Sequence, residues 1–231
     1  MKNFRKINLK DDIDKISEML LSSDNENYPL LFKEEKRIEI FSSLIKESKY
    51  FSYKNIYGYF SSDNKIVSSM MIFKKKNIFD EEKIKEILLR YDSYDEKIFN
   101  DIKNGYFLKL MNFHEDFYIY NLATDKDYFH QGYGKKLLTS FLNKYKDYSI
   151  SLECLKNNVN AFNFYCSVGF TSLYSFKTYT YFTSDLISYH MVYSLKKEKN
   201  FKINNSKIIL SLIFIFILLA VLITILILYL L

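Results

Sequence analysis

The chain has 231 residues, 48% of them hydrophobic, and a net charge of +6, which suits one ordinary domain with an appendage. Five lysines and one glutamate fall within 196–207, so residues 1–195 carry a surplus of only +2. So small a surplus argues against a nucleic-acid-binding domain. Two cysteines without a CxxC pair and three scattered histidines argue against a metal site, and none is expected.

The first third of the chain alternates between helical and strand patterns. Residues 3–9 read as a strand, and Asp11 or Asp12 is suited to cap a helix that follows. A second helix is predicted at about 33–48, with four apolar residues on one side: Ile38, Phe41, Leu44 and Ile45. Two strand-like runs then flank Asp63-Asn64, which predicts a β-hairpin.

The middle of the chain predicts one long helix followed by two strands. Residues 80–103 read as helical, with Ile84, Ile87 and Leu88 facing inward. Strands are predicted at about 105–111 and 117–123.

A glycine-containing loop follows the second of these strands and turns into a helix at Gly134. Gly132 and Gly134 let the backbone turn tightly and present its N–H groups. These donors lie at a helix N-terminus, which favours a phosphate, and Lys135 and Lys136 add positive charge. The loop lacks the GxxxxGK[ST] and GxGxxG patterns, so by itself it predicts either an anion site or an ordinary turn.

A strand at about 148–155 and a further helix that ends near Gly169 complete this region. Asn158, Ala161, Phe162 and Tyr165 are spaced to share one helix face, with the small Ala161 between two polar side chains. Such a face suits an extended ligand better than an apolar core. We expect both cysteines, Cys154 and Cys166, to be packing residues in a reducing compartment.

The tail from Ile208 to Leu231 contains no charged residue and as a helix would be about 36 Å long. A bilayer core of about 30 Å needs about 20 such residues, so 208–231 is predicted to be a transmembrane helix. The lysines of 196–207 are expected to form a basic linker on the cytoplasmic side. A secondary hypothesis is that these lysines contact anionic lipid. The N-terminus has no signal-peptide core, so the domain at 1–195 is expected in the cytoplasm.

The run NLATDKDYFHQGYGKKLL, then SLECL and NNVNAFNFYCSVGF, resembles the acetyl-CoA-binding half of GNAT acetyltransferases. The likeness is close over about 117–170 and looser for the first strand, the first helix and 189–195. It implies an α+β fold with α/β/α layers. Its sheet would be mixed, mostly antiparallel, and splayed between the fourth and fifth core strands, and the family uses acetyl-CoA as co-substrate without a metal.

The resemblance also implies the site residues. Loop amides would hold the CoA pyrophosphate, the backbone of Leu122 and Ala123 would pair with pantetheine, and Asn158 would hydrogen-bond the cofactor. The loop residues are Gln131, Gly132, Tyr133, Gly134 and Lys135. Phe129 departs from the family pattern, because it stands where (Q/R)xxGxG has a polar residue. This departure concerns the tightness of cofactor binding.

In such enzymes an amine attacks the thioester directly, so neither cysteine is needed as a nucleophile. Tyr165 would protonate the departing CoA thiolate. Glu153 matches the acidic position of the fifth strand and either accepts the amine's proton or only orders water. Glu115 and His114 are the other candidates for the base, although both are expected in a solvated turn. His190, in the last strand, is expected to be structural or to line the substrate site.

Three functions remain open from the sequence. The first is N-acetylation of a primary amine on a small molecule or protein, and the second is a membrane-tethered acyl-CoA-binding module or scaffold without turnover. The third keeps the enzyme and replaces the donor with a longer acyl-CoA.

Overall fold

The computed structural model describes residues 3–23, 32, 34–74, 78–97, 99–100, 103–104, 115–180 and 183–193, the side chains of 177–180 and 183–186 excepted. The chain divides into two units after Leu195. The predicted linker at 196–207 and the predicted membrane span at 208–231 lie outside the described residues. Among the residues that are described, no helix has the length and apolar character needed to cross a bilayer.

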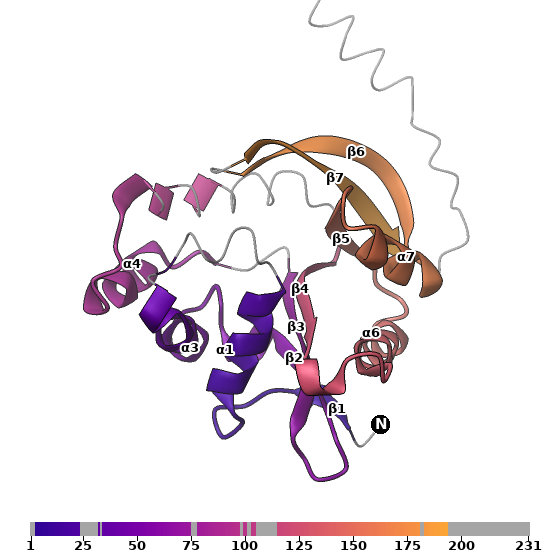
Figure 1. The fold of residues 1–231 in the computed structure, drawn as a ribbon, viewed down its shortest axis with the longest axis horizontal. Coiled ribbons are helices and arrows are strands. Elements are labelled where there is room, and N and C mark those ends of the chain that lie inside the picture. The colour runs from indigo at the N-terminus through magenta and orange to yellow at the C-terminus, as the bar shows by residue number, and fades with distance from the viewer. Residues whose placement is uncertain are drawn as a thin grey trace, which may run out of the picture. The chain divides into compact units, whose positions relative to one another are not determined.

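Seven strands of the described part of the chain form one sheet in the order β1-β2-β3-β4-β5-β7-β6 (Figure 1). They are β1 (Phe4–Lys6), β2 (Ile56–Phe60), β3 (Ile66–Lys74), β4 (Phe117–Thr124), β5 (Ile150–Leu155), β6 (Thr171–Thr180) and β7 (Thr183–Tyr193). The β4–β5 pair is parallel, and the other neighbours pair antiparallel. The predicted mixed, mostly antiparallel sheet is confirmed.

Helices cover both faces of this sheet and give it three layers. They are α1 (Ile13–Ser22), α3 (Arg37–Glu47), α4 (Glu81–Arg90), α6 (Tyr133–Lys144) and α7 (Val159–Ser167). In Figure 1, α1 and α3 lie on one side of the central strands and α6 lies on the other. Short 3-10 turns occur at Glu34–Lys36, Tyr53–Asn55 and Lys126–Tyr128.

Two apolar cores result, one on each face of the sheet. The core beneath α1 and α3 includes Ile16, Phe41 and Ile45, and the core beneath α6 includes Leu138 and Phe141. Strand β3 is buried along its length up to Lys74, as expected where a strand is covered on both faces.

The helix predictions at 33–48 and 80–103 need correction. Phe41, Leu44 and Ile45 are buried as predicted. Ile38, in the first turn of the helix that begins at Arg37, is 41% exposed, and Ile40 is buried instead. The second helix ends at Arg90, where Asp92 adopts a φ of +53°, and residues 96–97 are helical again. Its inward residues are confirmed as Ile84, Ile87 and Leu88.

Two further sequence predictions have different outcomes. The predicted strand at 105–111 lies outside the described residues. The sequence interpretation had no strand at β6, although Thr171–Thr180 is rich in Thr, Tyr and Phe, which favour strands. In the structure β6 pairs with β7 as a long antiparallel ladder.

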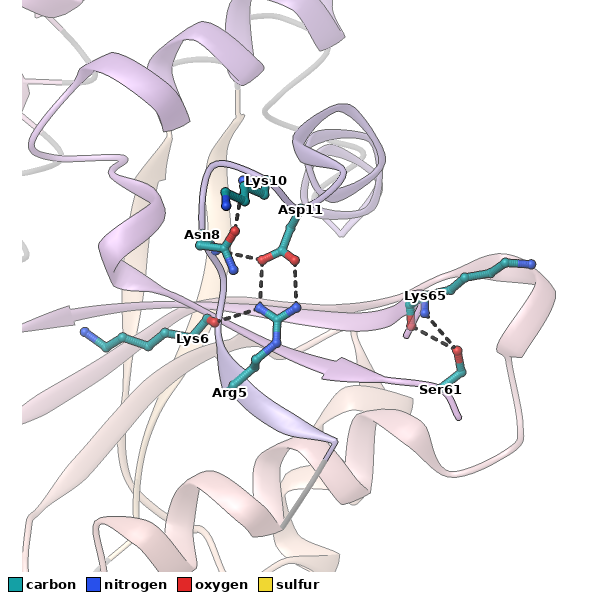
Figure 2. A network of polar contacts seen from close by, with 7 residues as sticks. All are labelled: Arg5, Lys6, Asn8, Lys10, Asp11, Ser61 and Lys65. Carbon is teal, nitrogen blue, oxygen red and sulfur yellow. Dashed lines mark hydrogen bonds and ion pairs between the residues drawn. The ribbon is translucent and has the colours of Figure 1, made fainter. Parts of the chain in front are cut away.

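The N-terminal strand is tied to the first helix by an ion pair (Figure 2). Arg5 donates through both terminal nitrogens to Asp11, at 2.8 and 2.7 Å, and the backbone N–H of Asn8 donates to the same carboxylate at 2.7 Å. The guanidinium also lies 3.7 Å from the centre of the Phe60 ring. Asp12 caps α1 through the N–H of Lys15, so the two aspartates have separate roles.

Replacing Asp11 with asparagine is expected to lower the free energy of unfolding at pH 7 by about 1–2 kcal/mol, because it removes two charge-assisted hydrogen bonds. Burial raises the pKa of this carboxyl, but the hydrogen bonds from Arg5 and Asn8 outweigh it, and the folded pKa lies below the ordinary value of 3.8. The stabilisation is therefore present above about pH 4 and lost as the pH falls through the folded pKa.

Denaturant unfolding at pH 7 and near pH 3 tests this expectation. Wild type and Asp11→Asn should converge at the lower pH. Asp147→Asn removes an exposed carboxylate and is the matched control, which should unfold like wild type. An equal loss for Asp11→Asn at both pH values would contradict the assignment to charge.

Candidate functional site

Strands β4 and β5 separate part of the way along their length. Their parallel pairing covers three positions and ends at Ile119 and Leu152. Beyond that point β4 pairs with β3 and β5 pairs with β7. Tyr120 is an extra residue in the β3–β4 ladder, a bulge that bends β4 where the separation begins. Past these positions the two described strands no longer pair with each other, as the predicted splay requires.

Leu122 and Ala123 lie on the separated part of β4. Their backbones pair with Met70 and Ser69 of β3, and Ser68 Oγ donates to the carbonyl of Ala123 at 2.7 Å. The edge of these residues toward β5 carries no strand partner, since the β4–β5 ladder has already ended. An extended ligand can hydrogen-bond there as an added strand does.

The glycine loop leads directly into α6. Gly132 has a φ of +77°, the left-handed region that favours glycine, and it is the N-cap of the helix. A Cβ at Gly132 would meet nothing within 4 Å, whereas one at Gly134 would lie 3.0 Å from Oγ1 of Thr124. Gly132 therefore permits the left-handed turn and leaves the space beside it open. Gly134 permits the close approach of the helix to β4.

The first turn of α6 presents unused donors to that open space. The N–H of Lys136 makes the first helical bond, to the carbonyl of Gly132 at 2.9 Å. Within the described part of the chain, the N–H groups of Tyr133, Gly134 and Lys135 have no acceptor, as expected for a helix start. Together with the helix dipole they form an arrangement suited to a phosphate.

The side chains of the loop add few hydrogen-bond donors to this arrangement. Gln131 Nε2 donates to the carbonyl of Asp127 at 3.3 Å and so supports the loop from within. Phe129 is 53% exposed and offers no hydrogen bond. Lys135 is exposed, and the ammonium of Lys136 lies 4.6 Å from the Tyr133 ring centre. The backbone rather than the side chains therefore supplies most of the donors.

Asn158 caps α7 instead of lying on its face, which corrects the predicted four-residue surface. Its side-chain oxygen accepts the N–H of Ala161 at 3.0 Å. The helix begins at Val159, so Ala161, Phe162 and Tyr165 share the face without it. The amide nitrogen of Asn158 is exposed and remains able to bind a ligand.

Replacing Asn158 with alanine is expected to cost about 1 kcal/mol of stability through the lost cap. Asn158→Ser is the matched variant, because serine caps a helix equally well and lacks the amide donor. Thermal unfolding should separate alanine from serine, and ligand titration should show whether serine also weakens binding. Equal stability of the alanine variant and wild type would contradict the capping role.

Tyr165 is half-buried on the α6 side of the sheet. Its ring packs against Phe164 and Phe170, with centroids 5.2 and 5.8 Å away. No described residue makes a hydrogen bond with its hydroxyl, which is thus available to a ligand. Burial, reinforced by the nearby Cys154, raises the pKa of Tyr165 well above its ordinary value, so the phenol keeps its proton at neutral pH.

The two cysteines differ. Burial raises the pKa of Cys154 to about 11, so it is a thiol at neutral pH and a poor nucleophile. Its prediction as a packing residue is confirmed. Cys166 is exposed, and its prediction as a packing residue is wrong, because α7 buries none of its residues completely.

On the opposite face of β5, Glu153 is the first residue past the last paired position. The buried Tyr118 hydroxyl hydrogen-bonds to its carboxylate, and burial together with the charge of Glu153 raises the pKa of Tyr118. His190 of β7 is directly opposite Glu153, and its Nε2 lies 3.4 Å from Oε1 of Glu115. His114 lies outside the described residues.

Tyr118 and Tyr174 were missed in the sequence interpretation. Their only signal is strand alternation, which identifies a face but does not identify the neighbours across the sheet. Among the residues that are described, no group of three His, Cys, Asp or Glu side chains is arranged to hold a metal ion.

Comparisons with known proteins agree with this geometry. Residues 94–172, which include the glycine loop, α6, β5 and α7, match the profile described as acetyltransferase (GNAT) domain. No curated protein matches the chain.

Three solved structures share the fold. An N-acetyltransferase from Staphylococcus aureus Mu50 is 22% identical, with a TM-score of 0.57 over 82% of this chain and 98% of its own. The structure described as histone acetyltransferase HPA2 and related acetyltransferase from Corynebacterium glutamicum is 16% identical, with a TM-score of 0.57 over 85% and 98%. A chain of the NatC complex bound to Gag peptide and CoA is 14% identical, with a TM-score of 0.50 over 84% and 98%.

At these identities the structures establish the fold, and the profile match adds the sequence of the glycine loop and of the helices around it. The chain therefore shares the fold of these acetyltransferases, and its residues 94–172 are similar to a GNAT acetyltransferase domain.

Proposed function

We propose that the protein transfers an acetyl group from acetyl-CoA to a primary amine by direct attack. The observation that carries this proposal is the end of the β4–β5 ladder at Ile119 and Leu152, beyond which Leu122 and Ala123 have no partner on β5. The open space at Gly132 and the Tyr165 hydroxyl, which has no hydrogen-bond partner among the described residues, support it. The CoA bound to the NatC chain, which has the same fold, supports the choice of donor.

The residues present fit CoA. Its pyrophosphate suits the N–H groups of Tyr133, Gly134 and Lys135, which have no acceptor in the described part of the chain. Gln131 and Gly132 shape this turn, while the exposed amide of Asn158 is free to donate to the cofactor. Pantetheine suits the unpaired edge of β4.

Bond making and breaking occur where β4 and β5 separate. The amine nitrogen attacks the thioester carbonyl, the C–S bond breaks, and Tyr165 gives its proton to the CoA sulfur. The raised pKa keeps Tyr165 protonated at neutral pH, so its hydroxyl carries the proton that the thiolate needs. Backbone N–H groups near Ala123 stabilise the oxyanion. The sequence prediction assigns Glu153 as the base.

A second candidate is a membrane-tethered acyl-CoA-binding module or scaffold without turnover. The exposed Phe129 at a normally polar loop position favours it. A longer acyl-CoA donor is a variant of the enzyme hypothesis. Transfer assays with acetyl-CoA and longer acyl-CoA separate these candidates.

The experiment uses the full chain in detergent. Titration with acetyl-CoA and with desulfo-CoA measures binding, and release of free CoA thiol measures transfer. The acceptors are an alkyl diamine, an amino sugar and a peptide with a free N-terminus. Binding with amine-dependent thiol release supports the proposal. Binding of CoA without release of its thiol, for every donor and acceptor, would support the scaffold hypothesis. A folded protein that binds no CoA would contradict both the enzyme and the scaffold hypotheses.

We also propose, from the sequence alone, that residues 208–231 anchor the domain at 1–195 to a membrane, with 196–207 as a basic linker and the domain cytoplasmic. Cell fractionation tests this proposal. The full chain should sediment with membranes and resist alkaline extraction, whereas a chain that ends at residue 200 should not. Equal fractionation of the two chains would contradict the anchor.

A further inference from the structure

A row of polar side chains crosses the sheet on the face turned away from α6. In β5, Ile150, Leu152 and Cys154 belong to the core beneath α6. Side chains alternate along a strand, so Glu153 lies on the other face. His190 is opposite Glu153 in the ladder.

The row extends beyond β5 on both sides. Tyr174 of β6 is opposite His190, and Tyr118 of β4 hydrogen-bonds to Glu153. The row therefore runs from Tyr118 through Glu153 and His190 to Tyr174, and it passes the point where β4 and β5 separate.

His190 and Glu115 form a shielded pair within this row. Their side chains are only 7% and 13% exposed, and Nε2 of the histidine lies 3.4 Å from the carboxylate. The Tyr174 ring stacks on the imidazole, with centroids 5.0 Å apart and planes 12° apart. With Nε2 facing Glu115, Nδ1 is the ring nitrogen left to accept a proton.

The carboxylate next to the imidazole is ionised. Burial raises the pKa of Glu115, but the hydrogen bonds from His190 and from its own backbone N–H outweigh this effect and lower it. Burial raises the pKa of Tyr174, and the charges of Glu115 and Glu153 add to this effect, which places both carboxylates close to the row. In the described part of the site, the imidazole contacts the Glu115 carboxylate and the Tyr174 ring.

Glu153, unlike His190, lies on β5 where β4 and β5 begin to separate. Its carboxylate already accepts the hydroxyl of Tyr118. His190 is opposite Glu153 on the next strand, about 5 Å away across the sheet, a separation that one bridging water spans.

We propose that His190 accepts the proton that the attacking amine loses, that Glu115 holds its imidazole in place, and that Glu153 binds the ammonium form of the acceptor. This inference rests on the proposed acetyl transfer and replaces Glu153 as the base. An ammonium loses two protons when it becomes an amide. One goes to His190 and then to water, and the other replaces the proton that Tyr165 gives to the CoA sulfur.

The test compares His190→Gln, Glu115→Gln and Glu153→Gln in the full chain in detergent, with the alkyl diamine as acceptor. We expect His190→Gln to lower kcat/KM for the amine about 100-fold with the acetyl-CoA Kd unchanged. Glu153→Gln should mainly raise the KM of the amine.

Glu115→Gln provides a measurement that a purely structural role of Glu115 would leave unchanged. The substitution removes the carboxylate that positions the imidazole, so it should lower kcat for the amine about 10-fold while the KM of the amine and the Kd of acetyl-CoA stay unchanged. Tyr189→Phe is the matched control, because Tyr189 is next to His190 on β7 and packs on the other face against Phe162. Its kinetics should equal those of wild type.

Three results would overturn the inference, and they are distinguishable. Wild-type kcat/KM in a folded His190→Gln protein removes His190 as the base. If that variant does not fold, a wild-type kcat in Glu115→Gln has the same consequence. Failure of the wild-type protein to acetylate any amine, despite binding acetyl-CoA, removes the proposed function and this inference with it.

Discussion

Replacing Tyr165 with phenylalanine is expected to lower kcat for acetyl transfer about 100-fold, without changing the affinity for acetyl-CoA. The substitution removes only the hydroxyl, and that hydroxyl has no hydrogen-bond partner among the described residues. The ring contacts with Phe164 and Phe170 are retained, so stability should remain close to that of wild type. The loss therefore falls on protonation of the departing thiolate.

Steady-state release of CoA thiol measures kcat, and calorimetric titration measures binding of acetyl-CoA. Cys166→Ala is the matched control, since Cys166 is the exposed neighbour of Tyr165 on the same helix. It should behave like wild type in both measurements. An unchanged kcat in Tyr165→Phe would remove the phenol as the acid.

Replacing Gly132 with tryptophan is expected to weaken acetyl-CoA binding about 30-fold, equivalent to about 2 kcal/mol. A large side chain would fill the space that is empty around the Gly132 Cα and separate a phosphate from the N–H groups of Gly134 and Lys135. The φ of +77° adds backbone strain of about 1–2 kcal/mol, which should lower the thermal stability slightly.

Gly132→Asn separates these two effects. Asparagine tolerates the left-handed conformation and is smaller, so it should bind acetyl-CoA more tightly than the tryptophan variant and melt near wild type. Calorimetric titration and thermal unfolding of both variants make the comparison. Wild-type affinity in both would show that the phosphate does not lie at this turn.

Sequence patterns correctly predicted the features that depend on residues close together in the chain. The left-handed turn at Gly132, the apolar stripe of α6 and the hairpin around Asn64 each depend on residues within one or two turns of each other. The splay between β4 and β5 was also predicted, through the resemblance of 117–170 to a family whose sheet has this feature. The helix that ends at Arg90 was predicted too long, since its periodicity continues past the residue where the backbone turns.

The remaining features depend on residues far apart in the chain. The need for glycine at position 134 comes from Thr124 of β4, and the pairing of Glu115 with His190 joins residues 75 positions apart. The sequence around Asn158 is compatible with a position on the face of α7 or with the N-cap of α7, and only the start of the helix at Val159 decides between them. Local periodicity determined which faces are apolar and where the donors of the loop lie. Only the strand order and register decided which polar side chains meet, because β7 is inserted next to β5 and brings His190 opposite Glu153.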